Sequence, residues 1–550
     1  MKLSYLFVTA FILLTLGASA QKKSTSSSIE RPKLVVGIVV DQMRWDYLYR
    51  YQDRYAKGGF KRLLQEGFSC ENTNIDYIPT VTAIGHSTIY TGSVPSLHGI
   101  AGNDFIIQAT GKSMYCTDDS TVKTVGSTSN AGEMSPNNLL VTTVTDELKL
   151  ATNFRSKTIG IAIKDRGGIL PGGHAANAAY WFDDLTGNWI TSTYYMKDLP
   201  AWVKTVNNQK LPQKYLDKNW NTLYPTNTYV QSEKDDSPFE GKFSGVNAPV
   251  FPYETSTMHK KDLSVIRATP YGNSITFDMA KATIDNEQMG QGDVTDFLAV
   301  SLSSTDYVGH QFGPNSIEAE DTYLRLDQDI ASFLTFIDNK LGKGNYTVFL
   351  SADHGAAHNP NFLLSHHIPA GLFPSGTITK ELNAILEKEF KQPNLVIGLT
   401  NYQVNLNKLV MEKSKLDESA IIKTCIQYLN KRSDIAYVVE MEKAQQASIP
   451  EQLKTRIING YNKDRSGAIQ IILKPGFYSG GATGTTHGTW NPYDAHIPFV
   501  LMGWGIKQGA TNRPVAMTDI APTISALLHI QAPNGNIGKP VIEALTSESK

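Results

Sequence analysis

The chain has few cysteines, almost no net charge and, after its first twenty residues, no long apolar run. Three cysteines in 550 residues cannot build a disulfide-dense scaffold, and their spacings match no cysteine-based metal site. The net charge of −1 gives no general electrostatic reason to expect nucleic acid or an anionic membrane as a partner. No later segment reaches the roughly 18 apolar residues that a membrane-spanning helix needs, so the sequence predicts no such span.

The first twenty residues are typical of a secretory signal peptide. Lys2 supplies the positive start, LFVTAFILLTL the apolar stretch, and Ala18-Ser19-Ala20 the small residues before a cleavage point. No cysteine lies near that point, which argues against a bacterial lipid-anchored form. We expect a signal peptide over residues 1–20, a flexible Ser-rich leader over 21–30, and a mature protein that is periplasmic or secreted.

An exported protein tolerates disulfides, so two of the three cysteines can form one. Cys70 with Cys116 is the expected pair, although the sequence alone does not establish the pairing. Cys425 would then be free or pair between chains.

Apolar runs alternate with helical patterns along the mature chain. Buried strands are predicted over 33–40, 157–163, 296–302, 346–352 and 496–505, and helices over 145–154 and 321–341. Because strand–helix alternation with fully apolar strands is typical of parallel sheets, we expect an α/β fold with a doubly wound, mostly parallel central sheet.

Two stretches break this rhythm within a single domain over residues 31–550. Residues about 196–270 are rich in Trp, Tyr, Pro, Asn and Lys and lack clear strands, and we interpret them as an insertion lying over the site. Residues about 371–465 have a helix–strand–helix–strand pattern and are predicted to form a small α/β insertion. The sequence shows no internal repeat and no third acidic cluster that would demand Mg²⁺.

Four short segments carry aspartate and histidine after or beyond apolar runs. The candidate ligands are Asp41, Asp306, His310, Asp353, His354 and His487. In open α/β sheets, ligands bind at the carboxyl ends of the strands. Mixed carboxylate and imidazole ligation suits Zn²⁺, and two ions roughly 4 Å apart suit phosphoryl transfer, although Mn²⁺ and Co²⁺ stay open as alternatives.

The spacing of these residues agrees with a shared site. Asp306 and His310 are four positions apart, so one helical turn puts both on the same face. Asp353 and His354 are adjacent and cannot share a helix face, so they can join one metal only from an irregular loop after a strand.

The segment 79–104 offers a nucleophile. A threonine at the turn before AIGHSTIYT would place its hydroxyl at a helix N-terminus, where main-chain amides favour an anionic oxygen and a bound phosphate. Chemistry alone does not choose between Thr80 and Thr82. In the same way Lys164 and Arg166 follow a predicted strand and can point toward the same site, where both would suit a phosphate group.

These segments together resemble the alkaline phosphatase superfamily, and closely its PafA-type single-threonine bacterial alkaline phosphatases. The resemblance runs through most of the mature chain, in VVDQMRWDYL, PTVTAIGHSTIYTGSVPSLHGIAGND, IAIKDRGGILPGGH, STDYVGHQFGPNS, SADHGAAH, GTTHGTWNPYDAHIPFVLMGWGI and MTDIAPTISALL. The superfamily's phosphodiesterases share a threonine followed 21 positions later by an asparagine, and here that spacing selects Thr82 as nucleophile and Asn103 as its oxygen-binding partner.

The resemblance also implies the remaining roles. It assigns Asp306, His310 and His487 to one Zn²⁺ and Asp41, Asp353 and His354 to the other, which makes two per chain. The family's monoesterases use a lysine and an arginine where this chain has Lys164 and Arg166, and its diesterases lack that pair.

The resulting hypothesis is an exported, two-zinc phosphate-monoester hydrolase that acts through a phosphothreonine on Thr82. Asn103, Lys164 and Arg166 would bind the substrate, a small phosphate monoester, and inorganic phosphate would leave as product. We expect no nucleic-acid polymer as partner and favour a monomer. The alternatives are a nucleotide pyrophosphatase or phosphodiesterase on the same scaffold, and a non-enzymatic envelope protein that binds metal or phosphate.

Overall fold

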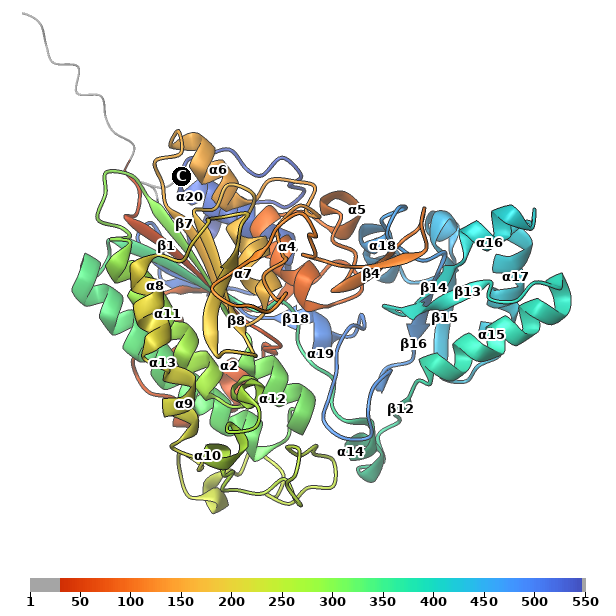
Figure 1. Ribbon diagram of the computed structural model, residues 1–550, viewed down its shortest axis with the longest axis horizontal. Helices are drawn as coiled ribbons and strands as arrows, with labels where there is room; N and C mark the ends of the chain where they lie inside the picture. Colours follow the sequence, from red (N-terminus) through yellow and green to blue (C-terminus); the bar gives the residue numbers. More distant parts are fainter. Residues whose placement is uncertain (1–29, 547–550) are drawn as a thin grey trace, which may run out of the picture. The chain divides into compact units, whose positions relative to one another are not determined.

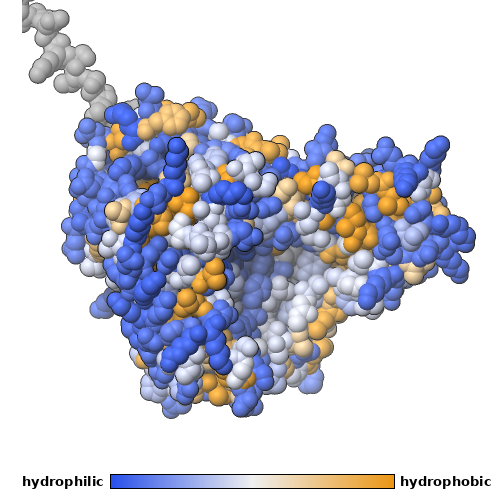
Figure 2. Space-filling model, in the orientation of Figure 1, coloured by the Kyte–Doolittle hydropathy of each residue, from blue (hydrophilic) through white to orange (hydrophobic). Residues whose placement is uncertain are grey.

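The computed structural model describes residues 30–546 (Figure 1). The predicted signal peptide and nearly all of the predicted leader lie outside these residues. Within them, no helix combines the length and the apolarity that a membrane crossing requires. On the face drawn in Figure 2, hydrophilic residues predominate and hydrophobic ones occur in small groups.

A ten-stranded sheet forms the centre of the chain. Its order is β20 (Gly509–Thr511), β2 (Phe68–Cys70), β19 (Phe499–Gly503), β11 (Tyr346–Ser351), β1 (Leu34–Val40), β10 (Asp296–Leu302), β7 (Thr158–Ala162), β8 (Ala178–Asp183), β9 (Asn188–Ser192) and β6 (Thr124–Val125). The five strands β11, β1, β10, β7 and β8 are parallel to one another. On either side the sheet continues with antiparallel pairs, β11–β19 and β8–β9.

The α/β prediction is therefore confirmed, with a parallel centre and mixed flanks. Every residue of β1 and of β10 is buried, because helices cover both faces of the sheet. One helical layer contains α4 (Thr82–Thr91), α6 (Val144–Ala151), α7 (Asp165–Gly172) and α20 (Ile520–Leu527), which contact one another. The other contains α3 (Phe60–Glu66), α11 (Tyr271–Asn286) and α13 (Ile317–Leu341) (Figure 1).

Helix α13 begins four residues before the predicted start at 321. The Ser316 hydroxyl accepts a hydrogen bond from the Ala319 amide (3.0 Å) and caps the helix, and Gly342 ends it with a φ of 86°. The structure also differs from the single long strand predicted over 496–505. This segment divides into β18 (His496–Ile497) and β19, which pairs antiparallel with β11.

A second sheet of four strands lies beyond β11 in the sequence. Its order is β13 (Val396–Thr400), β14 (Gln403–Leu406), β16 (Ile469–Leu473) and β15 (Ile435–Glu440), and it packs with α15 (Ser375–Phe390) and α17 (Glu418–Leu429) around a core of its own. The first strand of the predicted helix–strand–helix–strand pattern is instead the hairpin β13–β14, because Asn401 and Tyr402 have positive φ and turn the chain. Strand β16 extends this unit past residue 465.

The stretch between 196 and 270 consists of short helices and loops. It contains α8 (Ala201–Asn208), α9 (Leu211–Leu216) and α10 (Thr255–Met258), and Trp220 and Tyr253 pair as an isolated bridge. Helices α8 and α9 pack on α11.

The expected pairing of Cys70 with Cys116 is wrong. Cys70, Cys116 and Cys425 are all buried free thiols on separate elements. Cys70 ends β2, whereas Cys116 follows β5 (Lys112–Tyr115), which pairs only with β4 (Asp104–Ile107) in a separate hairpin. Burial raises the pKa of Cys70 to about 12, so this thiol is not activated.

Candidate metal and phosphate site

Four neighbouring strands deliver most of the candidate site residues to one edge of the sheet. Asp41 directly follows β1, and Asp353 with His354 follows β11. Helix α12 (Ser304–Phe312), which contains Asp306 and His310, comes directly after β10, and Lys164 comes after β7. Because β11, β1, β10 and β7 are adjacent and parallel, their carboxyl ends meet. The chain returns from the second sheet to place His487 at the same edge.

Asp306, His310 and His487 form the first group of ligand atoms close enough to share an ion. Nε2 of His310 lies 3.1 Å from Asp306 Oδ1, and Nε2 of His487 lies 3.6 Å from the same oxygen. Asp306 and His310 lie on one turn of α12, as their spacing predicts.

The histidine rings are oriented as metal ligands. Nδ1 of His310, His354 and His487 each lies 2.7–2.9 Å from a main-chain carbonyl, those of Thr485, Gly355 and Thr80 respectively. A carbonyl oxygen can only accept, so each Nδ1 holds the hydrogen and each Nε2 presents a lone pair to the carboxylates. Such anchoring of the remote ring nitrogen is characteristic of histidines that bind metal.

The second group that geometry gives is Asp41, Asp306 and His354. Asp353, which the family resemblance assigns to this ion, has its Oδ2 3.5 Å from His354 Nε2. Asp41 Oδ1 and Asp353 Oδ2 are buried without a hydrogen-bond partner. Buried carboxylate oxygens without a donor are unfavourable unless a cation satisfies them, so these residues fit the two Zn²⁺ that the sequence predicts.

Lys164 carries positive charge into this acidic centre. Its Nζ donates to Asp41 Oδ2 (2.7 Å) and to Asp306 Oδ2 (2.5 Å), and the side chain is almost fully buried. Burial and the neighbouring Asp353 raise the pKa of Asp41. Burial acts in the same direction on Asp306, but His310 and Lys164 hold its pKa well below the ordinary value. Burial also lowers the pKa of His487, which keeps this ring neutral and able to bind metal.

Thr82 is the first residue of α4, and its side chain is 1% exposed. Its Oγ1 lies 3.4 Å from His354 Nε2 and 3.5 Å from Lys164 Nζ. The Thr80 hydroxyl instead donates to the Thr489 carbonyl (2.8 Å) and serves to hold the chain near His487. The geometry therefore favours Thr82 over Thr80 as the hydroxyl that faces the metal ligands.

Asn103 and Arg166 are the remaining candidate phosphate-binding residues. Asn103 Oδ1 accepts from the Ala83 amide (2.8 Å), which fixes the side chain against the start of α4 and leaves its amide nitrogen free of this bond. Arg166 Nη1 donates to the Tyr115 hydroxyl (2.9 Å), and Tyr115 in turn donates to Asp165 (2.8 Å). Arg166 Nε is buried without a partner, so the guanidinium keeps a donor available.

Sequence reasoning missed two residues that shape the site. Gln42 directly follows Asp41. Its side-chain Nε2 donates to Asp306 Oδ1 (2.7 Å), and its main-chain N–H donates to Asp353 Oδ1 (3.1 Å). Its φ of 65° is unusual for a side chain of this size and is typical of strained backbone at functional sites. Tyr115, which holds Arg166, is 51 positions away from it in the chain and no local pattern links the two.

Gly85 allows α4 to approach the loop that holds the candidate ligands Asp353 and His354. A Cβ at this position would lie 2.3 Å from the carbonyl oxygen of Asp353 and 2.6 Å from its Cα. Only glycine therefore permits α4 to pack directly on the segment that holds Asp353 and His354.

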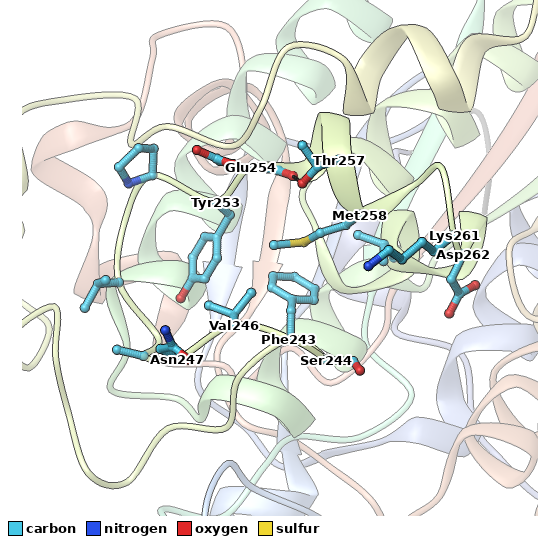
Figure 3. Close-up of a pocket in the computed structure, with 15 residues that line it drawn as sticks. Phe243, Ser244, Val246, Asn247, Tyr253, Glu254, Thr257, Met258, Lys261 and Asp262 are labelled. Carbon is cyan, nitrogen blue, oxygen red and sulfur yellow. Dashed lines mark hydrogen bonds between the residues drawn. The ribbon is translucent and has the colours of Figure 1, made fainter.

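A cavity of about 650 Å³ lies elsewhere, within the 196–270 stretch (Figure 3). The side chains of Phe243, Val246, Tyr253 and Met258 line it, and Lys261 and Asp262 stand at one side. None of the candidate ligands or phosphate-binding residues lines this cavity.

The chain is similar to several known proteins. The type I phosphodiesterase / nucleotide pyrophosphatase family matches residues 35–496. A Myroides odoratus protein named calcium-transporting ATPase is 60% identical over 94% of this chain and 96% of its own length. Alkaline phosphatase PafA of Elizabethkingia meningoseptica is 54% identical over 94% of this chain and 96% of its own.

Solved structures of PafA superpose on nearly the whole chain. The wild-type crystal structure has a TM-score of 0.93 at 54% identity, covering 94% of this chain and 100% of that one. A second crystal structure, also at a TM-score of 0.93, at 53% identity and with the same coverage, is of a PafA variant with substitutions at one threonine, one asparagine, one lysine and one arginine.

Proposed function

Because the chain belongs to the type I phosphodiesterase / nucleotide pyrophosphatase family, and within it to the PafA-like alkaline phosphatases, we propose that it hydrolyses phosphate monoesters at the site around Thr82. The observation that carries this proposal is Lys164, whose ammonium lies between the ligand carboxylates and 3.5 Å from Thr82 Oγ1. A monoester has two negative charges at neutral pH, and a buried lysine beside a nucleophile suits that charge better than it suits a diester.

The four substituted residues of the PafA variant support the assignment of roles. In that protein the threonine and asparagine are 21 positions apart and the lysine and arginine two apart. Thr82 with Asn103, and Lys164 with Arg166, have the same spacings here. We therefore infer that these four residues bind and transform the substrate, and that Asp41, Asp306, His310, Asp353, His354 and His487 hold two Zn²⁺.

The chain's own residues explain most of the reaction. Zn²⁺, when bound by these ligands, would lower the pKa of the Thr82 hydroxyl and stabilise the departing oxygen of the ester. The Thr82 hydroxyl gives its proton to solvent and Oγ1 attacks phosphorus. The bond between phosphorus and the ester oxygen breaks, the oxygen leaves as an alkoxide that takes a proton from water, and a phosphothreonine forms. Lys164 and Arg166 stabilise the charge on the non-bridging oxygens, and the amide of Asn103 donates to one of them. Water then attacks the phosphothreonine, releasing inorganic phosphate and restoring the hydroxyl.

Export is part of the same proposal. Residues 1–20 are typical of a signal peptide, and a periplasmic or secreted location would give the enzyme access to phosphate esters outside the cytoplasm. We further infer that the enzyme acts as a monomer on small esters.

The proposal is tested by metal analysis of the purified protein and by its rates on a monoester and a diester. We expect about two Zn²⁺ per chain, loss of activity on chelation, recovery with Zn²⁺, and a clear preference for the monoester. A preparation that is free of metal and fully active would contradict the two-zinc site. A preference for the diester would favour the phosphodiesterase alternative.

A further inference from the structure

The loop that carries Asn103 is held by a side chain from another part of the fold. This loop runs over residues 99–103 and leads into β4. Nδ2 of Asn401 donates to the Asp104 carbonyl (3.0 Å) and, over a longer distance, to the Ala101 carbonyl (3.5 Å). Because these two carbonyls lie on either side of Asn103, the Asn401 amide fixes the main chain around it.

Asn401 belongs to the second sheet. It is the first residue of the two-residue turn between β13 and β14, and β13 contacts β4 (Figure 1). The loop leaves room for its side chain, since a Cβ at Gly102 would lie 2.3 Å from Asn401 Nδ2. Glycine at position 102 therefore lets the Asn401 amide reach the main chain of the loop.

The turn that presents Asn401 is itself held firmly. Asn401 and Tyr402 have φ values of 59° and 57°, as a tight two-residue hairpin turn requires. Asparagine adopts such values readily, whereas tyrosine does so rarely. Contacts hold Tyr402 in place: its carbonyl accepts from the Ile471 N–H (2.8 Å), and its hydroxyl accepts from the Ser479 N–H (3.0 Å). Strained backbone that its surroundings fix in this way is typical of functional sites.

A second residue that precedes β16 holds the start of the same loop. Nη1 of Arg465 donates to the carbonyls of Gly99 (2.6 Å) and Asn138 (2.7 Å). Arg465 thus contacts the loop four residues before Asn103, whereas Asn401 contacts it on both sides of Asn103. Of the two, Asn401 is the one that can set the position of the Asn103 side chain.

We propose that Asn401 is a positioning residue of the phosphate site, through which the second sheet holds Asn103 in place to donate to a phosphate oxygen. The role rests on the proposed function, since Asn401 acts through Asn103. Asn103 Oδ1 is already bonded to the Ala83 N–H at the start of α4 (2.8 Å), so its amide is oriented at one end by α4 and its main chain at the other by Asn401. A displacement of roughly 1 Å in such a group can cost up to about a hundredfold in rate.

The test begins with two substitutions at position 401 in the zinc-loaded, full-length protein. Glycine adopts a positive φ without strain, so Asn401→Gly keeps the turn and removes only the side chain. It should lower kcat/KM for a monoester about tenfold and weaken inhibition by inorganic phosphate by a similar factor, with zinc content unchanged. Asn401→Asp should lose more, because carboxylate oxygens would face the two carbonyls. Asn394→Gly is the matched control and should change neither quantity, since Asn394 is an exposed asparagine with a φ of 60° in the same unit.

A double-mutant cycle separates positioning from a general effect on the fold. In an Asn103→Ala background, Asn401→Gly should change kcat/KM and phosphate inhibition by less than about twofold, because the group that Asn401 positions is gone. In an Arg166→Ala background, which keeps Asn103, most of the loss should remain.

Three outcomes would overturn the proposal. The first is natural kinetics in both Asn401 variants, and the second is an equal loss in Asn394→Gly. The third is a loss from Asn401→Gly that is the same with and without the Asn103 side chain, which would mean that Asn401 supports the fold in general. Failure of the proposed function gives a different result, namely no monoesterase activity or no effect of Asn103→Ala. An active enzyme that Asn103→Ala impairs and the Asn401 variants do not would contradict the positioning role alone.

Discussion

Replacing Arg166 with alanine tests the monoester assignment most directly. Arg166 donates to Tyr115 and keeps its Nε free of protein partners, so its planar fork is held ready for phosphate oxygens. A charged hydrogen bond contributes about 1.5 kcal/mol or more. Two such bonds to a monoester amount to about 3 kcal/mol, which is roughly a hundredfold loss in kcat/KM.

The same change should affect a diester less. One of the oxygens that the guanidinium would contact is esterified and uncharged, so about one charged bond is lost, and the rate falls roughly tenfold. The ratio of monoester to diester kcat/KM should therefore drop by about one order of magnitude. Tyr115→Phe should shift the ratio in the same direction but less, because it releases Arg166 without removing it.

The assay measures kcat/KM for a matched monoester and diester together with zinc content. Zinc content should not change in Arg166→Ala, because among residues 30–546 Arg166 makes no hydrogen bond or ion pair with a candidate metal ligand. Lys164→Ala is a less clean variant, since Lys164 also bonds Asp41 and Asp306 and its loss should alter zinc affinity. Arg155→Ala, at an exposed arginine outside the site, is the control. An equal loss on both substrates would refute the reasoning, because Arg166 would then support the fold or the nucleophile.

Three further predictions follow from the geometry. Peptide mapping after acid quench of substrate-treated protein should find the phosphoryl group on Thr82, and a phosphopeptide that maps elsewhere would overturn the assignment. Thr82→Ser should retain some activity, and Thr82→Ala should retain almost none. Gly85→Ala, whose Cβ would lie 2.3 Å from the Asp353 carbonyl oxygen, should lower stability by about 1–3 kcal/mol and reduce zinc content, whereas Gly376→Ala, with open space around it, should do neither. In metal-free protein, burial raises the pKa of Glu318 above its ordinary 4.5, so the folded state binds this proton more tightly than the unfolded chain. The free energy of unfolding should therefore fall as the pH rises from about 4.5 toward the raised pKa. Urea titrations at several pH values should show this slope, and Glu318→Gln should flatten it.

The sequence predicted the parallel centre of the sheet and the segments that carry the candidate metal ligands. Strands such as β1 and β10 are continuous apolar runs because helices cover both their faces, and such runs are visible without a structure. The i, i+4 spacing of Asp306 and His310 likewise follows from helix geometry alone. The choice of Thr82 over Thr80 rested on family resemblance, and the structure adds a local reason, since the Thr80 hydroxyl is bonded to Thr489.

Other features depend on contacts between residues far apart in the chain, and only the tertiary structure decided them. The hydrogen bonds that orient the three histidines come from carbonyls whose positions the sequence does not reveal. The sequence favoured a disulfide between Cys70 and Cys116, but each of these cysteines packs in its own part of the core. Helices α10, α11 and α12 and strand β10 separate Glu240 from Glu318 in the chain, so no pattern in the sequence predicts that Glu318 lies near enough to raise the pKa of Glu240. The local sequence sets the spacing of apolar residues and the preference for helix or strand. A site assembled across the fold depends instead on which distant segments the packing brings together.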